Sequence, residues 1–396
     1  MKKFLVVTFL IAATAIFLGI ASVATAETPF SCDPGSGSLP SNDPIYPENQ
    51  LILICNPANW NGDLIVYAHG YVPVQAPLSL PLDELTLPDG TFVPEVFLAQ
   101  GFAFATSSYH KNGVATEQAS SDLLDLISYF ETLVEPGSLK RVFIIGASEG
   151  GLIAVQLIEQ HPDRFDAGLA LCAPVGGAPT QIKYAEDFRV VFDYFFPDVF
   201  PFGAFNVPPN AFSDWQTLYV PQIIAAMKNN PSATAQLFSV TRAAVDPKKP
   251  ATFVETAIDI LFYSIWGTPD LISTTGGIPY DNRITLYLGL TNNLALNRGV
   301  ERVRGDRSAE QYAQEFYQTT GKLNRPLVTL HNTLDPIVTV EHELIYNALV
   351  ALEHKKQFFT VLPVQRYGHC NFTTNEILSA FGGMLLQVGQ QKPPVN

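Results

Sequence analysis

The segment Gly146-Ala147-Ser148-Glu149-Gly150-Gly151 decides how this chain is interpreted, because it has the pattern G-x-S-x-G. The strand-like run Arg141-Val142-Phe143-Ile144-Ile145 precedes it, and the helix-like run Leu152-Ile153-Ala154-Val155-Gln156-Leu157-Ile158 follows it. Strand, small-residue turn and helix together are the context in which this pattern makes a sharp turn that exposes a serine hydroxyl. The sequence therefore predicts that Ser148 is a nucleophile, the alternative being a glycine-rich turn without chemistry.

A serine in such a turn needs an acid and then a histidine later in the chain. Residues 326–332 predict a buried strand with Asp335 in the loop after it, and residues 356–362 predict another strand with His369 in the next loop. A neutral imidazole takes the serine proton during attack on a carbonyl, and a carboxylate orients the imidazole. We therefore predict a catalytic triad of Ser148, Asp335 and His369.

The other histidines near these motifs fit the role of the base less well. His161 closes the helix after the serine turn and is expected to be structural. His331 lies at the strand before Asp335 and is expected to be a core histidine, whereas His342 and His354 lie in a charged helical stretch and are expected to face solvent. The alternative for Asp335 is a turn aspartate that precedes a proline.

These motifs resemble those of α/β-hydrolase-fold serine hydrolases. The segment Pro57-Ala58-Asn59-Trp60-Asn61-Gly62, with a strand at 63–68 and His69-Gly70 after it, is similar to secreted esterases of the feruloyl esterase and tannase kind and to prolyl-oligopeptidase-like hydrolases. The resemblance covers roughly residues 50–180 and 325–390. It departs from the feruloyl esterase and tannase pattern at Ala147, where those families have a cysteine bridged to the one beside the histidine.

The resemblance also implies the oxyanion hole. In this fold one donor comes from the loop after an early strand, and the other is the N–H of the residue after the nucleophile. This assigns the backbone N–H groups of Tyr71 and Glu149. The side chain of Glu149 either orients neighbouring groups or points away from the site.

The chain has four cysteines, an even number that makes disulfides plausible in an exported protein. The resemblance places the end of the strand at 167–171 near the histidine loop, which implies the pairing Cys172–Cys370 and leaves Cys32–Cys55. Free buried thiols are the alternative. The spacing of cysteines and histidines suggests no metal site, and the predicted chemistry needs no cofactor.

The N-terminus and the net charge bear on location and partners. A basic start, an apolar stretch at 4–20 and the small residues Ala24-Thr25-Ala26 predict a secretory signal peptide cleaved after Ala26, and hence a secreted or periplasmic protein. An uncleaved membrane anchor is the alternative, but no later segment is apolar enough to span a bilayer. The net charge of −14 argues against nucleic acid and anionic membranes as partners.

Strand and helix patterns alternate through the first half of the chain. After an irregular arm at 27–50, strands are expected at 51–54, 63–68, 101–106, 141–145 and 167–171, with a helix at 120–134. This alternation predicts an α/β fold with a mainly parallel sheet and helices on both faces. The core is expected to comprise residues 27–179 and 326–396, interrupted by an insert at 180–325.

The insert is rich in aromatic residues. Of the 121 residues from 180 to 300, 19 are Phe, Tyr or Trp, against 26 of the other 275. This predicts a mostly helical cap, with helices in 210–228, 233–245 and 251–265, over an apolar substrate site. The alternative is that the aromatics form the cap's own small core.

Taken together, the sequence predicts a secreted serine hydrolase that cleaves a hydrophobic or aromatic carboxylic ester through an acyl-enzyme. The substrate is either a small ester or a polymeric one. A serine peptidase of the prolyl-oligopeptidase kind would use the same triad. A non-catalytic binding protein on the same fold is the alternative from another class, although such proteins usually lack part of the triad.

Overall fold

A computed structural model describes residues 32, 34–87 and 89–390. The predicted signal peptide at 1–26 lies outside these residues. Among the helices of the described part, none is both long and apolar enough to cross a membrane.

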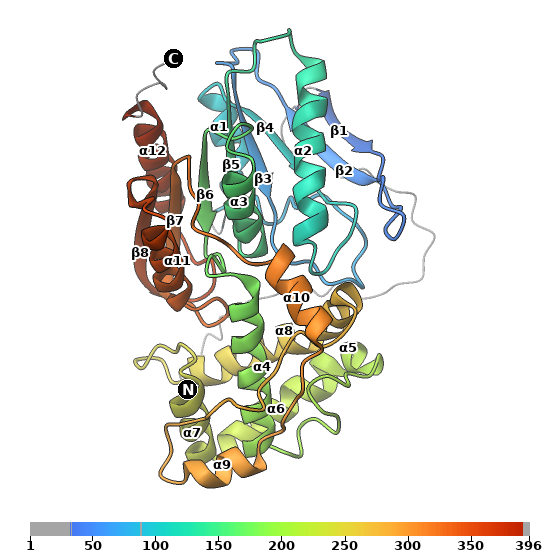
Figure 1. Ribbon diagram of the computed structural model, residues 1–396, viewed down its shortest axis with the longest axis vertical. Helices are drawn as coiled ribbons and strands as arrows, with labels where there is room; N and C mark the ends of the chain where they lie inside the picture. Colours follow the sequence, from blue (N-terminus) through green and yellow to red (C-terminus); the bar gives the residue numbers. More distant parts are fainter. Residues whose placement is uncertain (1–31, 33, 88, 391–396) are drawn as a thin grey trace, which may run out of the picture. The chain divides into compact units, whose positions relative to one another are not determined.

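The described residues form an eight-stranded sheet in the order β1-β2-β4-β3-β5-β6-β7-β8 (Figure 1). Strands β3 to β8 run parallel to one another, and β2 pairs antiparallel with both β1 and β4. The strands are β1 (Pro34–Leu39), β2 (Gln50–Cys55), β3 (Asp63–Ala68), β4 (Ala103–Ser107), β5 (Arg141–Ala147), β6 (Ala167–Leu171), β7 (Leu327–Leu334) and β8 (Phe359–Tyr367).

The predicted α/β fold with a mainly parallel sheet is confirmed, and the sequence erred at its two edges. Strand β1 lies in the arm that was expected to be irregular, because its Gly- and Ser-rich sequence lacks apolar alternation and it is held by backbone pairing to β2. At the other edge, residues Lys356–Phe358 form a 3₁₀ turn, so β8 starts later and extends further than expected.

Helices cover both faces of the sheet. Helices α2 (Thr116–Leu133), α3 (Glu149–Gln160) and α11 (Glu341–Leu352) contribute buried residues to one large core cluster with the strands. On the other face α1 (Val93–Ala99) and α12 (Thr374–Gln390) meet through the rings of Phe97 and Phe381, whose centroids are 4.8 Å apart. Helix α2 buries Leu123, Leu126, Ile127 and Phe130, a helical spacing that matches one apolar face.

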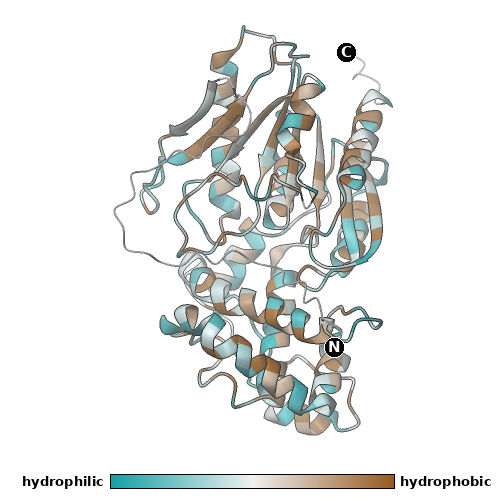
Figure 2. Cartoon of the chain, turned by 180° about the vertical axis from the view of Figure 1, so that it is seen from behind, coloured by the Kyte–Doolittle hydropathy of each residue, from teal (hydrophilic) through white to brown (hydrophobic). Residues whose placement is uncertain are grey.

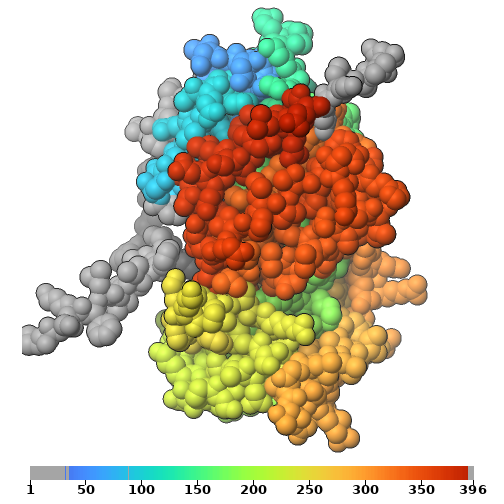
Figure 3. All heavy atoms as spheres, turned by 90° about the vertical axis from the view of Figure 1, so that its left-hand side faces the viewer, coloured from blue at the N-terminus to red at the C-terminus, as the bar shows by residue number. Residues whose placement is uncertain are grey.

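A second group of helices, which we call the cap, lies at one end of the sheet (Figures 1 and 3). It has its own apolar core, separate from that of the sheet, and hydrophobic residues mark both regions in Figure 2. The cap consists of α4 (Ala178–Phe195), α5 (Asn210–Asp214), the π-helical turn Trp215–Tyr219, α6 (Val220–Asn229), α7 (Pro231–Thr241), α8 (Thr252–Thr275), α9 (Asn293–Gly299) and α10 (Arg307–Phe316).

Most of the cap aromatics fill the cap's own core. Phe188 and Phe192 on α4 lie in this core with Trp215 and Phe238. Of the aromatic residues between 180 and 300, Tyr263 is the one that lines the cavity beside Ser148. For the other aromatics the contacts agree with the alternative, that they form the cap's own core, because a closed helical bundle needs large side chains to fill its interior.

Candidate active site

Ser148 stands at the sharp turn between β5 and α3. Its backbone has φ 55° and ψ −122°, a conformation that is strained for a residue with a side chain. The turn is possible because the neighbouring glycines allow close backbone approach: a Cβ at Gly146 would collide with the carbonyl of Gly150, and one at Gly150 with the carbonyl of Ala68. This geometry places the serine at the carboxyl edge of the sheet, as the sequence pattern predicts.

The structure brings the three predicted triad residues together from separate elements. His369 Nε2 lies 2.9 Å from Ser148 Oγ, and His369 Nδ1 lies 2.8 Å from Asp335 Oδ2. Asp335 follows β7 and is fully buried, and its Oδ1 accepts hydrogen bonds from the backbone N–H groups of Ile337 and Val338. An imidazole that donates from Nδ1 to this carboxylate presents the lone pair of Nε2 to Ser148 Oγ.

The loop that carries His369 is held by several hydrogen bonds that the sequence did not predict. The side chain of Asn332 donates to the carbonyl of Asn371 and accepts from its N–H, at 3.0 and 2.9 Å. The N–H of Gly368 donates to the carbonyl of Leu334. Asn332 lies at the end of a strand predicted from the sequence, but only the folded loop reveals its partner.

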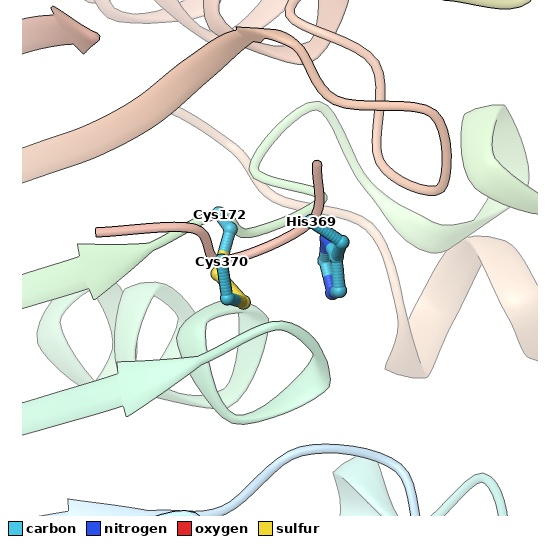
Figure 4. Close-up of side chains that lie close together, drawn as sticks. All are labelled: Cys172, His369 and Cys370. Carbon is cyan, nitrogen blue, oxygen red and sulfur yellow. A yellow bond between two sulfur atoms is a disulfide. The ribbon is translucent and has the colours of Figure 1, made fainter. Parts of the chain in front are cut away.

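Both predicted disulfide pairings are present, Cys32–Cys55 and Cys172–Cys370. The second joins the end of β6 to the histidine loop, and His369 extends beside it (Figure 4). Cys172, His369 and Cys370 bring three possible metal-ligand atoms within 4.8 Å of one another. Because both sulfurs belong to the disulfide, neither is a thiolate that could bind a metal.

The backbone N–H group of Tyr71 lies in the loop after β3. The N–H group of Glu149 lies at the start of α3, directly after Ser148. Neither N–H makes a hydrogen bond within the described part of the chain. The Tyr71 loop is fixed from below by Glu84, whose carboxylate accepts from Gly70 N–H at 3.1 Å and from the Tyr67 hydroxyl at 2.9 Å. Glu84 comes from the long loop before α1 and carried no signal in the sequence.

A cavity of about 150 Å³ opens beside Ser148, between the core and the cap. Its wall is mostly apolar and includes Leu152, Ile182, Leu271 and Val338. Two carboxyl groups also line it, Glu149 from the core and Glu186 from α4. The cavity therefore combines a short apolar space with a few polar groups next to the nucleophile.

The two cavity carboxyls have raised pKa values. Burial raises the pKa of Glu149 to about 7, opposed by hydrogen bonds from Ala115 N–H and Thr116 Oγ1. Burial likewise raises the pKa of Glu186 to about 7, opposed by the hydrogen bond from Thr268 on α8. Low polarity around a carboxyl penalises its charged form, so both groups change charge near neutral pH and not in the acidic range of an exposed carboxyl.

A further carboxyl of the cap, Asp259 on α8, lies near the histidine. Burial raises its pKa to about 6, while the charge of His369 lowers it. Thr256, three residues before it, pairs with the Tyr367 hydroxyl of β8 at 2.9 Å, and Tyr263, four residues after it, lines the cavity. The sequence placed this helix in the cap but gave no indication of which face turns to the site.

Two of the other histidines, His331 and His342, both lie in the core. His331 is buried, as expected, and contacts Glu343 and the carbonyl of Val338. Burial acts to lower its pKa, but the hydrogen bond to Glu343 and that group's charge outweigh burial and raise it. The expectation that His342 faces solvent is wrong: it is buried against Gly176 and Gln181, and burial lowers its pKa to about 3.

Comparison with known proteins agrees with this architecture. A model of the serine aminopeptidase S33 family matches residues 110–241, which include the serine turn and the start of the cap. The chain has the α/β-hydrolase fold. The family match and the serine turn both support a serine hydrolase on this fold. No curated protein matches this chain at a significant level.

Three solved structures illustrate how distant the similar proteins are. An acylaminoacyl peptidase of Pyrococcus horikoshii has 11% identity and a TM-score of 0.45, and the match covers 91% of this chain and 43% of that one. An esterase of Pyrococcus furiosus has 12% identity and a TM-score of 0.45, over 89% and 90%. Est1E of Butyrivibrio proteoclasticus has 13% identity and a TM-score of 0.41, over 90% and 100%. The α/β-hydrolase chain thus spans less than half of the peptidase, and these likenesses carry no inference about substrate.

Proposed function

We propose that the protein is an exported serine hydrolase that cleaves carboxylic esters through an acyl-enzyme. Ser148 is the nucleophile, His369 the general base and Asp335 the acid that orients it. The observation that carries this proposal is the unbroken chain of hydrogen-bond distances from Ser148 Oγ through His369 to the buried Asp335. The two disulfides support export, because such bonds persist in oxidising compartments.

The proposed reaction proceeds in two halves. Ser148 Oγ attacks the ester carbonyl while its proton passes to His369 Nε2, and the imidazolium then gives this proton to the departing alcohol. Water attacks the acyl-enzyme in the same way, which releases the carboxylic acid and returns the proton to Ser148. Asp335 stays ionised and stabilises the imidazolium in both halves.

Charge on the substrate oxygen is stabilised by the N–H groups of Tyr71 and Glu149. Neither donor is engaged by a described residue, and Glu149 N–H also belongs to the N-terminus of α3, where the helix dipole favours negative charge. The acyl group then lies in the apolar cavity beside Ser148, under residues of the 180–325 insert, which we propose acts as a substrate-covering cap.

Peptide hydrolysis is the second candidate, favoured by the match to a serine aminopeptidase model over residues 110–241. An ester is the less demanding substrate for the same machinery, because an alcohol leaves a tetrahedral intermediate more readily than an amine does. The test compares p-nitrophenyl esters with p-nitroanilides of the same acyl groups. Larger kcat/KM for the anilides would reverse the assignment, and failure of a fluorophosphonate to label Ser148 would remove both candidates.

A further inference from the structure

The cavity beside Ser148 contains polar atoms that no described residue satisfies. Oε1 of Glu149 accepts hydrogen bonds from Ala115 and Thr116, whereas its Oε2 accepts none within the described residues. The hydroxyl of Tyr263, which reaches the same cavity from α8, has no hydrogen-bond partner in this part of the chain either. Glu149 belongs to the core and Tyr263 to the cap, so the two groups meet a ligand from different elements.

Two other polar side chains on the cavity wall are already engaged. Thr268 donates to Glu186 at 2.9 Å, and Gln181 donates to the carbonyl of Ile337 at 2.8 Å. The hydroxyl of Tyr317, next to Tyr312, forms no hydrogen bond with a described residue. Glu149 Oε2 is the one carboxyl oxygen of the wall that no described residue engages, and Tyr263 Oη is the unpartnered hydroxyl that α8 supplies.

Tyr71 adds to the polarity of this region. Its hydroxyl is buried and forms no hydrogen bond with a described residue, and its ring meets that of Tyr263 edge-on with centroids 5.8 Å apart. A buried polar group without a partner costs free energy, which a ligand or water recovers when it supplies the missing hydrogen bond. Four polar atoms that no described residue satisfies, from Glu149, Tyr263, Tyr71 and Tyr317, thus favour a substrate that carries a polar group of its own.

The chemistry of the two available groups selects the kind of substituent. Above its pKa of about 7 Glu149 is ionised, and a carboxylate oxygen only accepts hydrogen bonds, whereas a tyrosine hydroxyl can donate one; the assays below are therefore made at about pH 8.5. A hydroxyl on the substrate donates to Glu149 and accepts from Tyr263, whereas an ether only accepts and an ammonium only donates. A cavity of about 150 Å³ also limits size, because a cavity of about this volume in an engineered protein holds benzene, with six heavy atoms.

We propose that the preferred substrate is a hydroxyacyl ester, with a short acyl group whose hydroxyl binds between Glu149 Oε2 and Tyr263 Oη. The proposal rests on the proposed ester hydrolysis through Ser148. Glu149 directly follows the nucleophile, so the hydroxyl belongs on the second or third carbon of the acyl group, close to the carbonyl that Ser148 attacks.

The test compares kcat/KM for p-nitrophenyl butyrate, 2-hydroxybutyrate and 3-hydroxybutyrate, each divided by the ester's rate of alkaline hydrolysis. At least one hydroxy ester should exceed butyrate by about 10-fold, since hydrogen bonds to charged groups are the stronger ones. Tyr263→Phe should reduce this preference by about 3- to 10-fold, the effect of one hydrogen bond. Tyr219→Phe, which removes a hydroxyl from the cap's own core, is the matched control and should leave the preference unchanged.

A second variant tests the acceptor. Glu149→Gln keeps an oxygen for Ala115 and Thr116 but turns an NH₂ group to the cavity, so it should discriminate less between the hydroxy ester and a 3-methoxybutyrate ester than the wild type does. Unchanged discrimination in this variant would remove Glu149 from the proposal. Equal rates for butyrate and both hydroxy esters would overturn the proposal as a whole, as would a larger preference for a 2-aminobutyrate ester.

The outcome for the proposed function is read separately. Turnover of butyrate measures ester hydrolysis whatever the preference for a hydroxyl. If no ester is turned over but a fluorophosphonate labels Ser148, protection of Ser148 by 3-hydroxybutyramide relative to butyramide still measures the site. Stronger protection by the hydroxyamide in the wild type, lost in Tyr263→Phe, supports it, and equal protection by both amides contradicts it.

Discussion

The core and the cap use large side chains in opposite ways. In the core, strands bury alternating or continuous apolar residues and end in loops that carry Ser148, Asp335 and His369. In the cap, α4 turns Phe188 and Phe192 into a closed interior but presents Ala178 and Ala185 to the cavity. A substrate space exists where side chains are small, so an excess of aromatics marks a well-filled interior and not a binding site.

The largest expected effect is at the nucleophile. Ser148→Ala should lower kcat/KM for esters by about 10⁴-fold or more, because the triad then lacks the atom that attacks. The fold should persist, since alanine is smaller than serine and circular dichroism and the midpoint of thermal unfolding should stay close to wild type. Ser213→Ala, at an exposed cap position, is the control. Residual activity above a tenth of wild type would place the nucleophile elsewhere.

The two disulfides should differ in what their loss does. In the chain-entropy model, the Cys172–Cys370 bond, with a separation of 198 residues, stabilises the fold by about 5 kcal/mol, and Cys32–Cys55, with 23, by about 3 kcal/mol. Replacing Cys172 and Cys370 together by serine should also lower kcat, by up to ~100-fold, because His369 loses its anchor. Urea unfolding and kinetics of both double variants separate these effects. An equal fall in kcat for the Cys32–Cys55 variant would contradict a specific role at the histidine loop.

The sequence was informative about the core for a physical reason. A strand end fixes where the next loop emerges, so the order of strands was enough to bring Asp335 and His369 near Ser148. The cap offered no such constraint. Whether Tyr263 or Trp266 of α8 turns to the cavity depends on how the helices pack, and a rotation of the helix about its axis by a fraction of a turn changes the answer. Glu84 and Asn332 escaped notice because no motif marks them, and their hydrogen-bond partners are set by how the loops fold.

A cap aromatic should matter for stability and not for substrate choice. Phe192 is fully buried among Phe188, Phe196 and Phe200. Phe192→Ala should lower the free energy of unfolding by about 3–5 kcal/mol, because it leaves a cavity in the cap core. The ratio of kcat/KM for butyrate to that for acetate should stay as in the wild type. A changed ratio in a folded variant would mean that the cap core also shapes the substrate site.

Glu186 is a cap residue that lines the cavity, and its ionisation should make the stability of the fold depend on pH. Its pKa in the folded protein, about 7, is above the ordinary value of 4.5, so the folded state holds a proton that the unfolded state loses. The stability it contributes is present below pH 4.5 and falls by up to ~3 kcal/mol as pH rises to about 7. Glu186→Gln should therefore lose less stability than wild type between pH 5 and pH 7.5 in urea unfolding. Glu135→Gln, at an exposed site, should behave as wild type, and an equally steep fall in Glu186→Gln would assign the pH effect to other carboxyls.

The smallest expected effect tests the small side chains on the cavity wall. Ala185 lies on α4 next to Glu186, lines the cavity of about 150 Å³ and packs against the edge of the cap core, one turn before Phe188 and two turns before Phe192. A larger residue there would fill part of the cavity. Ala185→Leu should lower kcat/KM for butyrate by about 10-fold relative to acetate. Room for one methylene group in an apolar pocket changes transition-state binding by about 1–3 kcal/mol. Stability should fall by no more than about 1–3 kcal/mol, the usual cost of overpacking, because the side chain can extend into the cavity and meets the cap core at its edge. If Ala185→Leu instead unfolds the cap and leaves the butyrate-to-acetate ratio unchanged, the acyl group does not lie in this cavity. The contrast between a filled cap core and an open cavity wall would then have no bearing on function.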